Sequence, residues 1–155
     1  MADPHKDKSI ESTKWKSAYD AASTDFNLAI QLPLTLDGVD GYTSIKNYRD
    51  LAQQNLKMLI MTAPGERMMD PLFGVGLRNF LFEQNDAGTH GELEARIHNQ
   101  IRMYLPYIEI LNVGFSTHAP EDQPEIRGTL VHVEIRYKIK PLDIYEVLDL
   151  SVTRN

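Results

Sequence analysis

Apolar residues recur along the chain with two different periods, and each period predicts a different kind of element. In the first patterned segment, apolar residues occupy every second position, which favours a half-buried extended segment. The alternating residues are Phe26, Leu28, Ile30, Leu32, Leu34 and Leu36. Because Pro33 has no N–H to donate, we expect this segment to lie at the edge of a sheet or to pack without full ladder pairing.

The next segment has the three- and four-residue spacing of an amphipathic helix, from Ile45 to Leu59. Thr43 or Ser44 is the expected N-cap, because a hydroxyl oxygen can accept a hydrogen bond from a free N–H of the first turn. Pro64 should lie just beyond the end of this helix, since proline cannot continue its hydrogen bonding.

A second long helix is predicted from Thr89 to Leu105. Thr89 and Glu92 have the spacing of a capping box, in which two side chains satisfy backbone N–H groups at a helix start. Pro106 should stop this helix. Between the two long helices, residues 77–82 predict a short helix of about two turns.

The rest of the chain predicts three strands, at 107–118, 128–139 and 144–152. Helices thus come before strands, which favours an α+β fold in which helices pack on a small, mainly antiparallel sheet formed largely by the C-terminal strands. We expect a single α+β domain over residues 25–155. The polar residues 1–24 should form an N-terminal arm that is flexible or ordered by a partner.

The connector between the first long helix and the short one, residues 62–77, is rich in proline and glycine. Pro64-Gly65 is followed by Asp70-Pro71 and by Phe73-Gly74. Proline fixes φ and glycine permits positive φ, so this density predicts a connector of one particular shape.

Composition narrows the classes of function. The chain has 155 residues and a formal charge of −6, which disfavours a general nucleic-acid binder because phosphate contacts need clustered Lys and Arg. It has no cysteine and therefore no disulfide or thiolate chemistry. No apolar run is long enough to span a bilayer, and residues 1–16 lack the apolar core of a signal peptide. We expect no nucleic-acid or membrane partner and no cofactor.

Two histidine patterns invite a metal-site interpretation. His90, Glu94 and His98 recur every four residues and could line one side of a helix as ligands, although solvated polar side chains explain them more simply. His118 and His132 lie on neighbouring predicted strands, where edge or cross-strand positions are the simpler interpretation.

Other candidate chemistry is equally open to a structural explanation. Gly74-Val75-Gly76 opens a helix, but Asn79 stands where a phosphate-binding loop would need its third glycine. Glu66 with Asp70, or Glu83 with Asp86, could supply the acid and base of a glycosidase. The alternative is a loop whose charges pair with neighbouring backbone or side chains. We expect no enzyme activity.

Several separated motifs, in order, resemble the baseplate wedge proteins of contractile-tailed phages, one of which initiates the sheath; type VI secretion systems have a related baseplate component. The resemblance covers residues 43–153. It is carried by Ser44-Ile45-Lys46-Asn47, Gly65, Arg67, Asp70-Pro71, Phe73-Gly74, Leu81-Phe82-Glu83, Tyr104, Pro106, Ile108 and Val133-Glu134-Ile135-Arg136-Tyr137. The family carries a Glu-Pro-Arg triplet that is implicated in docking on the helical core bundle of the wedge. Here that triplet is Leu105-Pro106-Tyr107, so Arg67 is a candidate for the missing charged contact.

The resemblance implies a structural subunit of a contractile-tail baseplate that docks on the core bundle. Because the predicted strands 128–139 and 144–152 can leave an unpaired edge, we expect the protein to template the first sheath ring by β-strand addition. The expected wedge-side residues are Glu66, Arg67, Asp70, Pro71, Phe73, Gly74, Pro106 and Tyr107. The expected sheath-side residues are Thr129, Val131, Val133, Ile135, Tyr137, Ile139, Val147 and Leu150.

The expected partners are the tail sheath protein, other wedge or core-bundle subunits and tube-proximal hub proteins, with several copies of the chain in a six-fold assembly. The resemblance places the protein in the virion tail baseplate, assembled in the host cytoplasm. A type VI-like secretion baseplate, an adaptor module and a peptidoglycan hydrolase are the alternatives.

Overall fold

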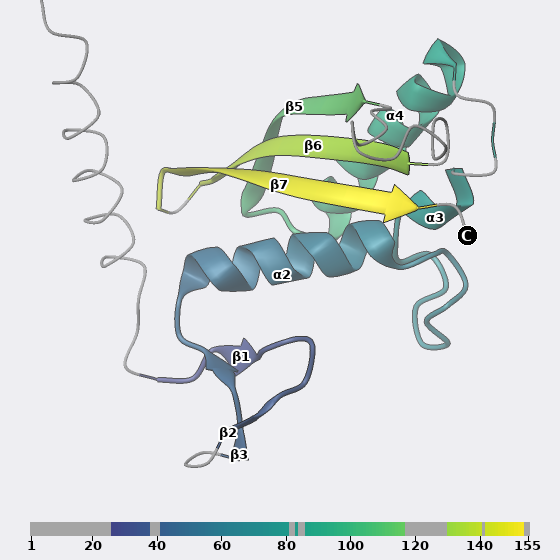
Figure 1. Ribbon diagram of the computed structural model, residues 1–155. Coiled ribbons are helices and arrows are strands. Elements are labelled where there is room, and N and C mark those ends of the chain that lie inside the picture. The colour runs from purple at the N-terminus through teal and green to yellow at the C-terminus, as the bar shows by residue number, and fades with distance from the viewer. Residues whose placement is uncertain are drawn as a thin grey trace, which may run out of the picture. The chain divides into compact units, whose positions relative to one another are not determined.

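The computed structural model describes most of the chain after the N-terminal segment (Figure 1). The described residues are 26–37, 41–80, 83, 86–116, 130–140 and 142–153. They divide between two compact units, residues 1–54 and 55–155, and each unit is described by itself. The expected arm of residues 1–24 lies outside the described residues, and the single domain over 25–155 stays a prediction.

The first unit contains two short antiparallel strand pairs. Strand β1 (Ala29–Ile30) pairs with β4 (Ser44–Ile45), and β2 (Leu36–Asp37) pairs with β3 (Gly41–Tyr42). Helix α2 (Tyr48–Met61) begins in this unit and ends in the second.

The prediction of a half-buried extended segment is wrong for most of its side chains. Phe26, Ile30, Leu32, Leu34 and Leu36 are exposed. The reason is that each pair joins only two residues of each strand, so no continuous sheet face forms to cover alternate side chains.

The helix side chain Gln54 takes the place of a further strand beside this segment. Its Oε1 accepts a hydrogen bond from the N–H of Leu32 at 2.8 Å, and its Nε2 donates to the carbonyl of Ile30 at 3.0 Å. Backbone polar groups near Pro33 are thus satisfied by an amide side chain instead of a ladder.

The expected N-caps of α2 are also wrong. Ser44 belongs to β4, and the residue that caps the helix is Asn47, whose Oδ1 accepts a hydrogen bond from the N–H of Arg49 at 2.8 Å. Asn47 is buried, and its position two residues before that N–H is typical of an N-cap.

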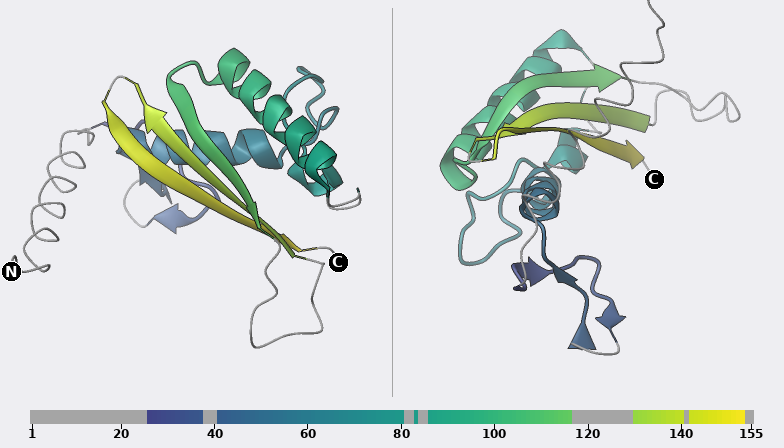
Figure 2. Two further views of the ribbon diagram at one scale, coloured as in Figure 1. Left: turned by 90° about the horizontal axis from the view of Figure 1, so that it is seen from above. Right: turned by 90° about the vertical axis from the view of Figure 1, so that its left-hand side faces the viewer.

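The second unit is an antiparallel sheet with helices on one side, so the predicted α+β class is confirmed (Figures 1 and 2). Its helices are the C-terminal half of α2, α3 (Leu77–Phe80) and α4 (Ala87–Tyr104). Its strands are β5 (Ile108–Ser116), β6 (Leu130–Ile139) and β7 (Ile144–Thr153), and β6 lies between the other two. The three predicted strands are therefore confirmed, with slightly shorter bounds for β5.

The core of this unit lies between the sheet and the helices. The alternation predicted in β6 is confirmed, because Val133, Ile135 and Tyr137 are fully buried. Their neighbours His132, Glu134, Arg136 and Lys138 lie on the opposite face, which is polar. From the helices and β7, the core receives Leu56, Leu59, Ile60, Leu93, Ile97, Ile101, Ile144, Leu148, Leu150 and Val152. Each fully buried apolar side chain of this size stabilises the fold by about 1.5–3 kcal/mol.

The expected capping box at Thr89 is wrong, because α4 begins earlier. Asp86 is the N-cap, and its Oδ1 accepts a hydrogen bond from the N–H of Thr89 at 2.8 Å. The end of α4 is confirmed, since Leu105 is its C-cap and Pro106 follows. The described part of the predicted short helix is α3, and Leu81-Phe82 lies outside the described residues, so its expected length of two turns stays a prediction.

We expect Asp86→Ala to lower the Tm by about 2–4 °C at neutral pH, because it removes the N-cap of α4. The hydrogen bond from the backbone N–H of Thr89 is the main reason that the pKa of Asp86 lies below its usual value. A lowered carboxyl pKa stabilises the folded state above the unfolded pKa, so the effect should fade as the pH falls below about 4. Thermal unfolding followed by circular dichroism from pH 7 to 3 checks this. Glu92→Ala is the control, and a Tm loss as large as that of Asp86→Ala would restore the capping-box assignment.

Candidate functional site

The connector of residues 62–77 folds back on the end of α2 as a closed loop. The N–H of Gly65 donates to the carbonyl of Pro71 at 2.9 Å, which brings the two sides of the loop together. The N–H of Val75 donates to Leu59 at 3.0 Å, and that of Gly76 donates to Thr62 at 2.9 Å. These backbone hydrogen bonds hold the connector in one particular shape, as its density of proline and glycine predicts.

Helix α4 holds the other side of the connector through one side chain. The Oε1 of Gln100 accepts from the N–H of Gly74 at 2.9 Å, and its Nε2 donates to the carbonyl of Leu72 at 2.9 Å. Gly74 has φ +108°, and a Cβ there would lie 2.2 Å from the carbonyl oxygen of Thr62. Only glycine fits this close approach of two backbone segments.

A row of contacting side chains fixes the charged part of the connector. The Arg67 guanidinium lies 3.6 Å above the centre of the Phe73 ring, and Phe73 packs edge-on against Tyr104 of α4 at 4.9 Å. The hydroxyl of Tyr104 donates to Oδ1 of Asp70 at 3.0 Å, and this bond is the main reason that the pKa of Tyr104 is raised. Arg67 therefore has a structural contact within the chain, beyond its expected role toward a partner.

The most exposed apolar side chains of the connector were not among the expected site residues. Met68, Met69 and Leu72 are 93%, 98% and 74% exposed, although the backbone around them is held by hydrogen bonds. We call these three residues the connector tip. The sequence signal is a pair of methionines inside a Pro- and Gly-rich turn, where polar residues are usual.

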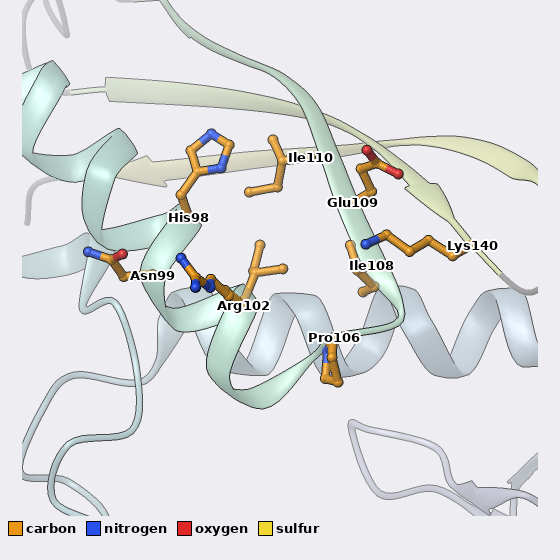
Figure 3. A pocket seen from close by; sticks show the side chains of 9 residues that line it. His98, Asn99, Arg102, Pro106, Ile108, Glu109, Ile110 and Lys140 are labelled. Carbon is orange, nitrogen blue, oxygen red and sulfur yellow. The ribbon is translucent and has the colours of Figure 1, made fainter.

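The turn that follows α4 is held from two sides within the same unit. Tyr107 accepts a hydrogen bond at its hydroxyl from Nδ2 of Asn55 at 3.1 Å, and its carbonyl accepts from the N–H of Lys140 at 3.0 Å. Pro106 itself is exposed and lines a groove between α4 and β5 (Figure 3). The expected wedge-side residues thus fall into two places, the connector and the turn at the end of this groove.

The two places lie on different faces of α4. Gln100 and Tyr104 are four residues apart and contact the connector, whereas Asn99 and Arg102 line the groove. At about 100° per residue, these two pairs lie on opposite sides of the helix.

The expected sheath-side residues need a correction, because most belong to the middle strand or the core. Strand β6 is paired on both sides, so its backbone cannot receive a further strand. Five of these side chains are buried and cannot touch a partner directly: Val133, Ile135, Tyr137, Ile139 and Leu150. Thr129 and the side chain of Val131 lie outside the described residues. Val147 is exposed on β7, and β7 forms an edge of the sheet.

Three of the four carboxylates weighed as catalytic pairs have structural contacts. Oε2 of Glu66 accepts from the N–H of Ala63 at 2.9 Å, Asp70 binds Tyr104, and Asp86 caps α4. A glycosidase acid needs a raised pKa, whereas the pKa of Asp86 is lowered. The geometry thus favours the alternative in which loop charges pair with neighbouring groups.

The metal-site alternative gains no geometric support. His90 stacks on the ring of Phe115 at 4.7 Å, and His98 pairs with Glu94 at 4.0 Å. Within the described ranges, no three His, Asp or Glu side chains come together as metal ligands. No helix in the described part of the chain has the length and hydrophobicity that a bilayer-spanning segment needs.

We expect Gly74→Ala to destabilise the protein more than Gly65→Ala. Both glycines have positive φ, which costs an alanine about 1–2 kcal/mol, but a Cβ at Gly65 would meet open space. At Gly74 the collision with Thr62 should add about 1–3 kcal/mol. Urea unfolding of both variants checks this, and equal midpoints would contradict the close approach.

Comparison with known proteins adds to this geometry. The structure is similar to that of a supposed tail lysozyme from Geobacter sulfurreducens, with 21% identity and a TM-score of 0.59 over 73% of this chain and 96% of that one. It is also similar to a chain of the anti-feeding prophage baseplate, with 21% identity and a TM-score of 0.60 over 72% of this chain and 84% of that one. At this level of identity, both likenesses concern the fold. No curated protein is significantly similar to the chain.

The sequence also matches a protein family over more than half of its length. Residues 46–141 match the family described as baseplate wedge protein gp25. This match includes the connector, α4 and the Val133–Tyr137 part of β6, which carried most of the resemblance in the sequence. The chain therefore belongs to the gp25 family of baseplate wedge proteins.

Proposed function

We propose that this protein is a structural subunit of a contractile-tail baseplate that docks on other baseplate subunits through its connector and offers strand β7 to the first ring of the sheath. The observation that carries the proposal is the connector tip, an apolar surface on a loop whose backbone is already fixed. Membership of the baseplate wedge family supports the general role.

The connector tip has the properties of a docking surface. Its three apolar side chains are exposed to water, and contact with a partner would remove most of that area. The flexible side chain of methionine adapts its shape to a partner. The hydrogen bonds of Gln100 hold the loop in order before binding, so binding requires little further loss of conformational entropy. The expected wedge-side residues Glu66, Arg67, Asp70 and Pro71 surround this tip in sequence.

Strand β7 supports the sheath-side part of the proposal. Among the described residues no strand pairs with its outer side, so its outward N–H and C=O groups are available for strand addition. Tyr145 and Val147 are exposed on the polar face and can contact side chains of an added strand. Sheath subunits would then continue the sheet in register, and contraction would pull on a hydrogen-bonded ladder.

The expected partners follow from this arrangement. The connector side would contact wedge or core-bundle subunits and tube-proximal hub proteins, and β7 would contact the tail sheath protein. Several copies would occupy a six-fold baseplate in the virion tail, after assembly in the host cytoplasm, without enzyme activity of their own. A type VI-like secretion baseplate would use the same two surfaces, and neighbouring genes distinguish the two settings.

For the docking side, we expect Met68→Ser/Met69→Ser/Leu72→Ser to fold normally but to lower the amount of protein in purified tails by about tenfold or more. Loss of about 1.4 kcal/mol of binding free energy is sufficient for a tenfold change, and interface anchors often contribute more. Quantitative immunoblotting of purified particles measures the effect.

The control for the tip replaces exposed apolar residues elsewhere in the same unit. Met103 and Leu111 are 66% and 52% exposed, and Met103→Ser/Leu111→Ser should leave incorporation close to that of the unaltered protein. If both variants are incorporated equally, the connector tip is not the docking surface.

For the sheath side, we expect Val147→Lys/Ser151→Lys to leave the baseplate intact but to prevent most sheath polymerisation. Charged lysines on an edge strand oppose the pairing of a further strand. Point substitutions are preferable to deletion of the C-terminal strand, because Ile144, Leu148 and Leu150 belong to the core. Negative-stain electron microscopy counts tails with and without a sheath.

The opposite edge strand, β5, provides a matched control at positions that pair with the same two residues of β6. Asn112 on β5 and Val147 on β7 lie on either side of Arg136. Ser116 on β5 and Ser151 on β7 likewise lie on either side of His132. Asn112→Lys/Ser116→Lys should therefore leave sheath assembly unchanged. If tails that carry the Val147→Lys/Ser151→Lys variant assemble normal sheaths, β7 is not the template.

A further inference from the structure

The groove between α4 and β5 combines an apolar floor with a mainly basic rim. It has a volume of about 460 Å³, and α4 lines it on one side while β5 and Lys140 line it on the other (Figure 3). Ile101 and Ile108 are buried beneath it, and Pro106 closes one end. All its lining residues belong to the second unit.

The charges around the groove are unequal. Arg102 and Lys140 are exposed at its rim, and no ion pair involves either of them in the described part of the chain. Glu109 is the one carboxylate in the lining, and Nε2 of His98 lies 4.0 Å from Oε1 of Glu94. A locally basic groove on a chain of net charge −6 favours a guest that is itself acidic.

We propose that this groove receives an acidic segment of another baseplate subunit, with apolar side chains on the isoleucine floor and carboxylates against Arg102 and Lys140. The inference rests on the proposed baseplate role and names the chemistry of one partner. Arg102 can bind a carboxylate through two parallel hydrogen bonds, and Lys140 adds a second positive charge across the groove.

The walls of the groove are positioned before any partner binds. The N–H of Lys140 donates to the carbonyl of Tyr107, so the turn after α4 and the end of β6 are joined at the backbone. The N–H of Ile108 donates to Leu105 at 2.9 Å, which fixes the start of β5 against the end of α4. A guest would therefore meet a formed site, and only its own segment would need to become ordered.

A protein segment fits the groove better than a nucleic acid does. Nucleic-acid sites depend on several clustered cations, because each phosphate contact adds to the affinity. Here Glu109 would repel a phosphate backbone beside the two cations, whereas a peptide can place a neutral or hydrogen-bonding residue near that carboxylate.

The first test reverses these two charges in the protein and follows its incorporation into contractile particles. We expect Arg102→Glu/Lys140→Glu to lower the amount of protein in purified particles at least about tenfold, because two attractive contacts become repulsive. Lys57→Glu/Arg78→Glu makes the same change of charge at exposed positions elsewhere and should be incorporated as the unaltered protein is. Thermal unfolding checks that both variants are folded.

The second test identifies the guest by photo-crosslinking. Asn99 lies at the rim, and replacing it with p-benzoylphenylalanine should yield, in assembled particles, a crosslink to an acidic segment of another baseplate subunit. A crosslink to a neutral or basic segment, a crosslink to nucleic acid, no crosslink, or normal incorporation of Arg102→Glu/Lys140→Glu would overturn the inference. Absence of the unaltered protein from particles would instead overturn the proposed baseplate role.

Discussion

The pairing of one side-chain amide with the connector backbone holds the candidate docking loop in place. Gln100 accepts from the N–H of Gly74 and donates to the carbonyl of Leu72, much as a neighbouring strand would. The connector has backbone polar groups on both sides, and without this amide one side would lack two of its partners. Gln54 makes the same kind of pairing in the first unit, with the backbone of Ile30 and Leu32. In each unit, a helix glutamine thus stabilises an irregular segment that no strand covers.

The second unit presents three candidate docking surfaces. One face of α4 holds the connector and leaves its apolar tip exposed, and the opposite face forms the basic groove with β5. The third surface is the outer edge of β7. An assembly subunit needs separate contacts for separate partners, and here each surface has a different chemistry: apolar, basic and backbone polar. Such differences help to prevent one partner from occupying the site of another.

Much of this fold is predictable from the sequence where a pattern is long. The alternation in β6 was sufficient to predict a strand with one buried face, and Pro106 was sufficient to predict the end of α4. Both predictions depend on local geometry alone. The N-caps were mispredicted because several residues near each helix start, such as Ser44 and Asn47, can all accept the same hydrogen bond. The sheath-side residues were misassigned for a different reason. Alternation shows that one face of a strand is buried, but it does not show whether the strand lies at an edge of its sheet. The connector tip was missed because exposure depends on how the loop is folded back, and Gln100 lies far from it in sequence.

A cryo-EM structure of the intact, uncontracted particle tests the central claim most directly. The account predicts that Met68, Met69 and Leu72 are buried against a neighbouring baseplate subunit and that the outer edge of β7 pairs with a strand of the first sheath ring. A structure in which the connector tip faces solvent and β7 has no added strand would contradict it.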